Sequence, residues 1–314
     1  MKKIINFLIY PIDFFLYILL IPASIIMLIF KKIGSSKLNF SRNLLFKIGI
    51  FPIIDHYYEP QFNFENLKKE LDEKRNLPGI NFDITQQLFL LEKINYKEEL
   101  LNLNLEIGSP NTNFKIDNNF FERGDAEIYY SMIRYYKPKK IIEIGSGFST
   151  LIALEANKKN NSNSTITCIE PYENSWLEKL DINLIRKKIE QIDFKNEINL
   201  ESNDILFIDS SHIIRPEGDV LKIFHEILPI LNKGVIIHVH DIFTPFNYPS
   251  AWIKKENRFW NEQYLLESLL DNSKRYSVLC SLNYLKNEKY NELSKICPYL
   301  KKNSMPGSFY IKIN

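Results

Sequence analysis

The sequence predicts a doubly wound α/β protein. Its mainly parallel, seven-stranded sheet should carry helices on both faces, and an N-terminal, membrane-associated helical segment should precede it. Three observations support this prediction. Apolar strand-like segments alternate with helix-like segments from residue 124 onward, a paired-glycine turn follows the first of these strands, and residues 4–30 are almost wholly apolar. Such alternation is typical of parallel strands joined by helices that cover the sheet.

The predicted strands are short and nearly all apolar, as expected where both faces of a parallel sheet are buried. The last two differ from the rest and close the sheet. The strands are expected at residues 140–144, 165–170, 183–189, 204–209, 234–240, 276–281 and 308–313. A helix is expected before the first of them, at residues 124–136, and others between the first five, at residues 149–157, 175–180 and 217–228.

Composition narrows the function classes. The 314 residues include 40 basic and 38 acidic side chains, and this near-balance gives no sign of a nucleic-acid partner. The three cysteines, Cys168, Cys280 and Cys297, are far apart and show no CxxC spacing. We therefore expect reduced thiols in a cytosolic compartment, with neither a disulfide framework nor a structural zinc site.

The apolar run at residues 4–30 lies between two pairs of lysines and contains Pro11 and Pro22. Its uncharged part, residues 14–30, is at the short end of what can span a hydrocarbon core. A cleaved signal peptide and a buried core helix are the alternatives. The favoured interpretation is a membrane anchor, which either spans the membrane or returns as a helix broken at a proline.

Basic residues are more frequent after the apolar run than before it. By the positive-inside rule, the part of the chain that follows should face the cytoplasm. Residues 44–54 form a second apolar stretch, which could lie on the membrane surface or pack on the domain. The basic residues after the run are Lys31, Lys32, Lys37, Arg42 and Lys47.

These patterns divide the chain into three predicted parts. Residues 1–54 form the anchor and its amphipathic segment. Residues 55–122 form an extension of loops and helices, with helices at residues 63–74 and 84–94. Residues 123–314 form the α/β domain.

The strongest local motif follows the first strand and reads Glu143-Ile-Gly145-Ser146-Gly147. Paired glycines allow a tight, Rossmann-like turn and close approach of the backbone to a ligand. A dinucleotide site would have a third glycine where this chain has Thr150. A carboxylate ahead of the turn should favour a cationic group over a phosphate, which suits S-adenosylmethionine (SAM).

A second acid, Glu170, ends the next predicted strand. A carboxylate at this point can accept hydrogen bonds from both ribose hydroxyls of a nucleoside. This spacing fits SAM and NAD alike, so it supports a nucleoside without identifying it. The alternative is a solvated carboxylate with no ligand.

Residues 121–242 resemble the class I SAM-dependent methyltransferases, in the style of those associated with bacterial cell-surface glycans and secondary metabolites. The resemblance rests on the two motifs above and on the segments at residues 204–212 and 234–241. It implies that residues 143–147 hold the amino-acid half of SAM and that Glu170 binds its ribose. Gln191 or Asp193 would contact the adenine.

Four polar side chains follow the fourth and fifth strands: Asp209, His212, His240 and Asp241. Ligands of open α/β sheets bind outside the carboxyl ends of the strands, so Asp209 should lie beside the cofactor. His212, Asp209 and His240 are candidate catalytic groups, because a histidine or aspartate can accept a proton from a hydroxyl.

Some related methyltransferases bind magnesium at these two strand ends, which makes Asp209, His240 and Asp241 candidate ligands of a divalent cation such as Mg²⁺. Magnesium prefers oxygen ligands, and His240 does not fit that preference. A metal site, a metal-free base and purely structural histidines all remain open. Residues 243–252, rich in aromatic residues and proline, would be a substrate lid or a packed loop.

The resulting prediction is a SAM-dependent methyltransferase. It would methylate an oxygen of a glycan, a lipid-linked compound or another small molecule at the cytoplasmic face of a membrane. One alternative is a hydroxylase or oxidoreductase built on the same sheet. The other is a SAM-binding protein without catalytic activity.

Overall fold

The computed structural model describes residues 2–51, 53, 56–161, 164–172 and 174–314. The chain forms two compact units, Met1–Lys68 and Lys69–Asn314. The boundary expected between residues 54 and 55 lies outside the described residues. Residues 69–122 belong to the same unit as the sheet, so most of the predicted extension is part of the domain.

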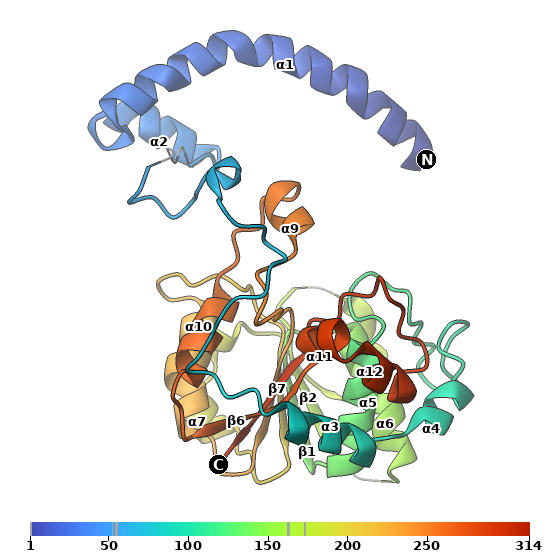
Figure 1. Cartoon of the computed structure of the whole chain (residues 1–314). Helices are drawn as coiled ribbons and strands as arrows, with labels where there is room; N and C mark the ends of the chain where they lie inside the picture. The colour runs from blue at the N-terminus through green and yellow to red at the C-terminus, as the bar shows by residue number, and fades with distance from the viewer. Residues whose placement is uncertain (1, 52, 54–55, 162–163, 173) are drawn as a thin grey trace. The chain divides into compact units, whose positions relative to one another are not determined.

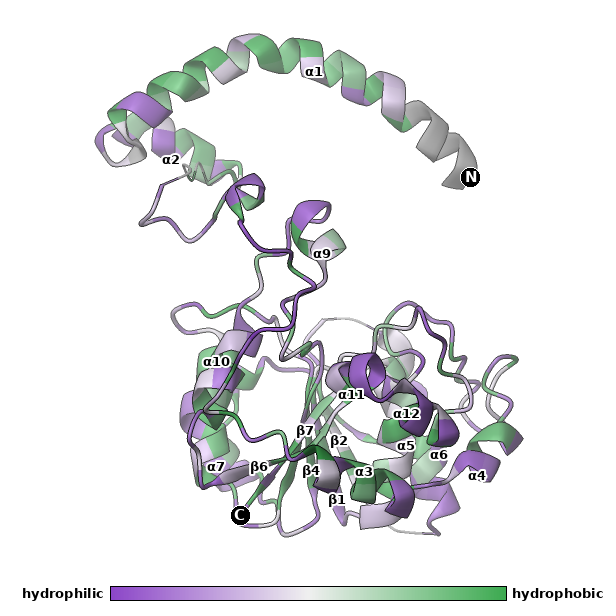
Figure 2. Ribbon diagram, viewed as in Figure 1, coloured by the Kyte–Doolittle hydropathy of each residue, from purple (hydrophilic) through white to green (hydrophobic). Residues whose placement is uncertain are grey.

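The first unit consists of helices α1 (Lys2–Ile33) and α2 (Asn39–Lys47) and two single turns, Ser35–Lys37 and Phe64–Asn66. Helix α1 runs through both prolines without the predicted break. Its stretch Ile9–Ile33 is long and apolar enough to cross a membrane, by length and composition, and no other described helix is. Figure 2 shows hydrophobic residues along most of this helix.

The helix predicted at residues 63–74 is wrong beyond its first turn. Toward its end, the backbone of this segment forms hydrogen bonds to a distant loop. The Arg75 amide donates to the Pro245 carbonyl at 3.0 Å, and the Asn247 amide donates to the Leu71 carbonyl at 3.3 Å. These long-range hydrogen bonds replace the helical ones, which a local charge pattern cannot reveal.

The second unit contains the predicted seven-stranded sheet, in the order β3-β2-β1-β4-β5-β7-β6. The strands from β1 to β5 are parallel, and β7 is antiparallel to both of its neighbours. The observed bounds are β1 Lys140–Ile144, β2 Thr165–Ile169, β3 Asn183–Ile185, β4 Ile205–Ile208, β5 Ile236–Val239, β6 Tyr276–Ser281 and β7 Phe309–Ile313.

Helices cover both faces of the sheet, as predicted (Figure 1). One core lies under α3 (Ile84–Lys93), α4 (Lys97–Asn102), α5 (Asp125–Tyr136), α6 (Phe148–Lys159), α11 (Leu282–Glu288) and α12 (Tyr290–Ile296). The other lies under α7 (Phe194–Glu197), α8 (Asp219–Lys222) and α10 (Glu262–Leu270). A short helix, α9 (Ser250–Lys254), interrupts the connection from β5 to α10.

Side chains of strand β1 point alternately into the two cores. Ile141 belongs to the first core, whereas Ile142 and Ile144 belong to the second. Because side chains alternate along a strand, Glu143 points to the α5 and α6 side. The turn after β1 therefore starts from a strand that is buried on both faces.

Candidate methyltransferase site

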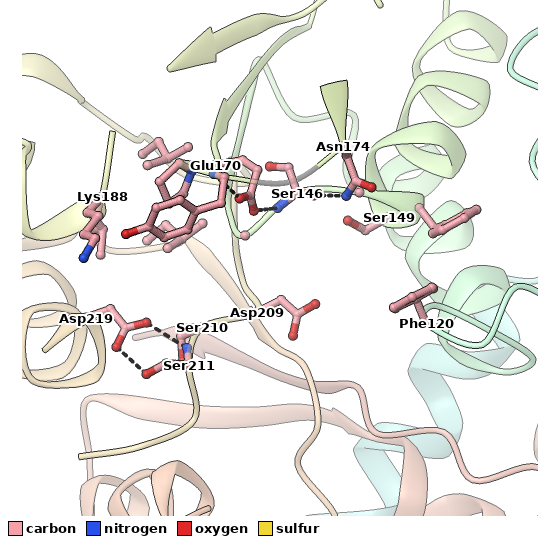
Figure 3. Close-up of a pocket in the computed structure, with 18 of the residues that line it drawn as sticks. Phe120, Ser146, Ser149, Glu170, Asn174, Lys188, Asp209, Ser210, Ser211 and Asp219 are labelled. Carbon is pink, nitrogen blue, oxygen red and sulfur yellow. Dashed lines mark hydrogen bonds between the residues drawn. The ribbon is translucent and has the colours of Figure 1, made fainter. Parts of the chain in front are cut away.

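A cavity of about 570 Å³ lies at the carboxyl ends of β1, β2 and β4 (Figure 3). This is the edge where the sheet rule places a ligand. Its walls come from the glycine turn, from the segments after β2, β3 and β4, and from the loop that precedes α5. The residues that the argument uses are Phe120, Gly145, Ser146, Gly147, Glu170, Lys188, Ile189, Glu190, Asp209 and Arg215.

The glycine turn passes between the ends of β2 and β4. The Gly145 amide donates to the Ile169 carbonyl at 3.0 Å, and the Asp209 amide donates to the Ile144 carbonyl at 2.8 Å. Gly145 has a φ of 79°, and a Cβ there would lie 2.0 Å from the Asp209 carbonyl oxygen. Only glycine fits this position, both in conformation and in space.

Glu170 lies opposite this turn and lines the cavity. Its carboxylate accepts hydrogen bonds from the amides of Ser146, at 3.3 Å, and Tyr172, at 3.0 Å. Asn174 donates to the Ser146 carbonyl at 3.3 Å and holds the turn from the other side. The structure thus brings together Gly145, Ser146, Gly147 and Glu170.

Glu143 requires a correction. Its side chain is fully buried and does not line the cavity. The carboxylate accepts hydrogen bonds from Thr150 and, at 3.1 Å, from Tyr129. Burial raises the pKa of Glu143 to about 7, against the opposing effect of these hydrogen bonds. Glu143 therefore supports the turn from below, and it does not hold a cationic ligand group.

The two residues predicted to contact the adenine lie outside the cavity wall. The Gln191 side chain accepts a hydrogen bond from the Lys188 amide, and Asp193 caps α7. Neither residue lines the cavity, whereas Ile189 and Glu190 do. The third strand was predicted to end at residue 189, but β3 ends at Ile185. The residues that follow this strand at the cavity therefore come earlier in the sequence than predicted.

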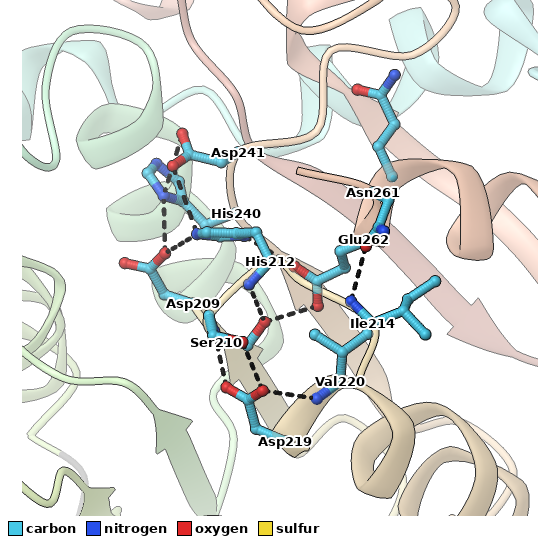
Figure 4. Close-up of polar contacts among 12 residues, drawn as sticks. Asp209, Ser210, His212, Ile214, Asp219, Val220, His240, Asp241, Asn261 and Glu262 are labelled. Carbon is cyan, nitrogen blue, oxygen red and sulfur yellow. Dashed lines mark hydrogen bonds and ion pairs between the residues drawn. The ribbon is translucent and has the colours of Figure 1, made fainter. Parts of the chain in front are cut away.

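At the other end of the cavity, Asp209 meets two residues from the end of β5 (Figure 4). The Nδ1 atom of His240 lies 3.5 Å from Asp209 Oδ1 and 3.7 Å from Asp241 Oδ1. Ligand atoms of all three residues lie within 4.8 Å of one another. The structure thus brings together the three predicted metal ligands.

These residues fit a divalent cation. The buried His240 Nδ1 atom has no hydrogen-bond partner among the residues that the structure describes, and it lies beside two carboxylates. Imidazole nitrogen and carboxylate oxygen together suit ions such as Mn²⁺ or Fe²⁺ better than Mg²⁺.

His212 lies among three carboxylates. Its Nδ1 is 2.8 Å from Glu262 Oε2, and its Nε2 is 3.4 Å from Asp209 Oδ1 and 3.7 Å from Asp241 Oδ2. Burial lowers the pKa of His212, but the hydrogen bonds to Asp209 and Glu262 outweigh it and raise the pKa to about 10. These carboxylates favour the protonated form of His212, and its predicted role as a catalytic base stays a prediction.

Two further side chains define the surroundings of this cluster. His238, two residues before His240, is buried, and its Nε2 lies 2.8 Å from Ser308 Oγ. Burial lowers its pKa, so this histidine is neutral and structural. Glu262 on α10 also accepts a hydrogen bond from Ser210 at 2.9 Å. Sequence reasoning missed Glu262, because no local pattern links it to His212.

Known proteins resemble the chain in the region of this site. Residues 142–242 match the model of a family described as a methyltransferase domain, and this stretch runs from β1 to just past β5. A protein of Archaeoglobus fulgidus, described as uncharacterised, is 33% identical over 173 residues, which cover 50% of this chain and 76% of that one. Residues 142–242 of the chain belong to this family of methyltransferase domains.

Two solved methyltransferase structures are similar to the chain at low identity. One is a Podospora anserina methyltransferase bound to SAH, with 17% identity, 60% of this chain and 77% of that one covered, and a TM-score of 0.39. The other is an O-methyltransferase from Bacillus cereus in complex with SAH, with 14% identity, 72% and 90% covered, and a TM-score of 0.35.

The predicted resemblance to class I methyltransferases is confirmed at the level of the family and of the fold. The matched stretch contains both halves of the cavity edge, from the glycine turn to Asp241. It excludes α10, which supplies Glu262, and it excludes the whole first unit of this methyltransferase.

Proposed function

We propose that this methyltransferase transfers a methyl group from SAM to an oxygen atom of a small acceptor, of the glycan or lipid-linked class, at the cytoplasmic face of a membrane. The main support is the cavity at the ends of β1, β2 and β4, where two carboxylates flank a paired-glycine turn. The acceptor class and the membrane face rest on the first unit.

The charges around the turn favour SAM over a dinucleotide. Glu170 and Asp209 both line the cavity, on the two sides of Gly145 to Gly147. A pyrophosphate placed on this turn would be repelled by both carboxylates, whereas the sulfonium and ammonium groups of SAM would be attracted. The Glu170 carboxylate lines the cavity, where it can accept hydrogen bonds from ribose hydroxyls, and Ile189 offers an apolar surface to the adenine.

The reaction is an in-line displacement. An acceptor oxygen attacks the methyl carbon, the bond from carbon to sulfur breaks, and the electron pair stays on sulfur in SAH. The acceptor hydroxyl loses its proton to a base. The candidates to receive it are the groups gathered at this point: the carboxylates of Asp209 and Asp241 and the rings of His212 and His240.

A divalent cation held by Asp209, His240 and Asp241 would lower the pKa of an acceptor hydroxyl bound to it. The protein contributes the arrangement around that point. Asp209 belongs both to the cavity wall and to the ligand cluster, so the cofactor and the acceptor oxygen can meet beside it.

The membrane location is supported by α1 and its flanks. The candidate span Ile9–Ile33 contains Lys31 and Lys32 near its end, and further basic residues follow. An excess of positive charge on this side favours a cytoplasmic location for the rest of the chain. An enzyme kept at a membrane has ready access to acceptors that are themselves embedded there.

The decisive test is cofactor binding to Glu170→Gln. Isothermal titration of the full-length chain should detect SAM binding and no NAD binding. The substitution should weaken SAM about 10- to 100-fold, because a hydrogen bond to a charged group contributes about 1.5–3 kcal/mol. Glu178→Gln is the matched control, since Glu178 is exposed and pairs with Arg186 outside the cavity.

The same preparation separates the alternatives. Tight binding of NAD in place of SAM would support an oxidoreductase. Binding of SAM without transfer of its tritiated methyl group to any membrane extract of the source organism would support a protein without catalytic activity. Transfer to a component whose mass rises by one methyl group would identify the acceptor.

A further inference from the structure

The loop after β5 begins beside the part of the site where the acceptor would bind. The cofactor cavity occupies the ends of β1, β2 and β4, and the next strand along, β5, is followed by His240 and Asp241. The loop of residues 243–248 continues from there. If the proposed function is correct, an acceptor that meets the methyl group beside Asp209 lies close to the start of this loop.

The loop also reaches the site through aromatic contacts. The rings of Tyr248 and Trp260 meet edge to face, with centroids 6.0 Å apart. The Trp260 ring lies 4.2 Å from the ring of His212, and His212 Nε2 lies 3.4 Å from Asp209 Oδ1. A displacement of the loop would therefore move Trp260 and His212, and with them the side chains in contact with Asp209.

Helix α10 holds the loop from one side. Gln263 accepts a hydrogen bond from the Phe243 amide at 2.7 Å and donates to the Phe246 carbonyl at 2.9 Å. Glu267, one turn further on, accepts a hydrogen bond from Thr244 Oγ1 at 2.6 Å. The same helix carries Glu262, which binds His212, so α10 fixes both strand-end segments.

Arg75 holds the loop from the other side. Its guanidinium forms a two-pronged ion pair with Glu267, in which Nη1 donates to Oε2 at 2.8 Å. Nη2 also donates to the Phe246 carbonyl at 2.9 Å, and the backbone amide donates to the Pro245 carbonyl. Planar, bidentate pairing of this kind is specific to arginine.

We propose that Arg75 is a positioning residue for the acceptor. Its ion pair with Glu267 and its hydrogen bonds to the 243–248 loop hold this loop in place beside Asp209, His240 and Asp241, where the acceptor would bind. Residues 69–75 are the first residues of the second unit. The segment that holds the loop is therefore the one that follows the first unit in the sequence.

The test compares Arg75→Met with Arg134→Met in the full-length chain in detergent. Arg134 is the matched control, because it also forms a two-pronged ion pair, with Glu99 at 2.7 and 2.8 Å, and also lies over a tyrosine ring. Its pair joins α5 to α4, away from the site. Both variants lose a similar ion pair, but only one loses contact with the loop.

Three quantities are measured: hydrogen exchange of residues 242–250, the Kd for SAM, and the apparent KM of a solubilised membrane extract in methyl transfer from tritiated SAM. In Arg75→Met, loop exchange and the KM for the extract should both rise about tenfold or more, with the Kd for SAM within twofold. Arg134→Met should leave all three unchanged. Arg75→Lys, which keeps the charge, should recover part of the loss.

Unchanged loop exchange in Arg75→Met would overturn the proposal. So would a loss of SAM affinity as large as the rise in KM, since that would indicate a general disturbance. If the unmodified chain binds no SAM, the proposed function fails, while hydrogen exchange still reports whether Arg75 holds the loop.

Discussion

At the scale of single residues, a buried hydrogen bond explains why the glycine motif lacks the third glycine of the dinucleotide pattern. Thr150 stands where a third glycine would stand, and its hydroxyl donates to the carboxylate of Glu143 below the turn. The acid and the threonine satisfy each other inside the core. The electrostatic preference for a cation then rests on Glu170 and Asp209, which face the cavity.

The buried carboxyl of Glu143 predicts a pH dependence of stability. Its pKa rises from an ordinary value of 4.5 to about 7. The unfolded chain loses this proton first, so the folded state binds more protons between these values, and stability falls as the pH rises through this window. The fall from this group is about 3 kcal/mol in all.

Urea unfolding of Glu143→Gln at pH 5, 6, 7 and 8 checks this dependence. The fall in unfolding free energy should be about 3 kcal/mol smaller in the variant than in the unmodified chain. Glu127, whose pKa is also raised to about 7, contributes a fall of the same sign in both proteins. Equal falls in variant and unmodified chain would contradict a buried, raised carboxyl at position 143.

Gly145→Ala should damage the turn through contact as well as conformation. The new Cβ would lie 2.0 Å from the Asp209 carbonyl oxygen, so the ends of β1 and β4 must separate. We expect a loss of about 2–4 kcal/mol of stability, with SAM binding weakened at least tenfold. Gly49→Ala is the control: its φ of 78° is almost the same, but nothing lies within 4 Å.

At the scale of elements, the strand ends opposite the site are held by one buried side chain. Asp204, at the start of β4, accepts hydrogen bonds from the amides of Lys139 and Lys140 at 2.9 Å each, and from the Glu201 amide at 2.9 Å. It thereby joins the beginnings of β1 and β4. The glycine turn at their far ends depends on this register.

Asp204→Ala should therefore lower stability by about 2–4 kcal/mol, because three backbone amides lose the carboxylate of a buried residue as their acceptor. The cavity lies at the other end of the sheet, so SAM affinity measured below the unfolding transition should stay within about threefold. Asp193→Ala, which removes an exposed cap of α7, should cost only about 1 kcal/mol. A large loss of SAM affinity in Asp204→Ala would contradict this separation.

The connection from β4 to β5 differs from the single predicted helix at residues 217–228. It consists of the short helix α8, a wider π-helical turn at Ile223–Ile227 and a tight turn at Leu228–Ile230. Asp219, at the start of α8, accepts hydrogen bonds from the amide of Ser211 at 2.7 Å and from its hydroxyl. The segment after β4 is thereby held next to the cavity.

At the scale of the whole molecule, the chain combines a catalytic domain with a separate apolar unit. Sedimentation of the full-length chain should place it with membranes after a carbonate wash. A chain that begins at Lys69 should remain in solution and bind SAM with unchanged affinity, since no cavity-lining residue precedes that point. Equal activity of the shortened chain on a water-soluble acceptor would refute a lipid-linked acceptor.

Orientation is tested on the same full-length chain. Protease added outside intact spheroplasts should leave the domain whole, whereas protease added to inverted vesicles should release it. Release from intact spheroplasts would overturn the cytoplasmic location, because the basic residues after α1 would then face outward.

The sequence by itself determined the strands, the helices α3, α5 and α6, and the glycine turn. These features depend on local properties: apolar runs of strand length, helical spacing and a backbone conformation that only glycine adopts at Gly145. The grouping of Asp209, His240 and Asp241 also followed from the sequence, because parallel strands end at one edge of a sheet.

Only the tertiary structure decided what the ionisable groups do there. Glu143 faces the core because of which helices pack on that side of β1. The ring of His212 is held by Glu262, fifty residues further along the chain. The extended path of residues 69–75 likewise depends on partners in the 243–248 loop. Burial and charge arise from residues distant in the chain, and local patterns carry no record of them.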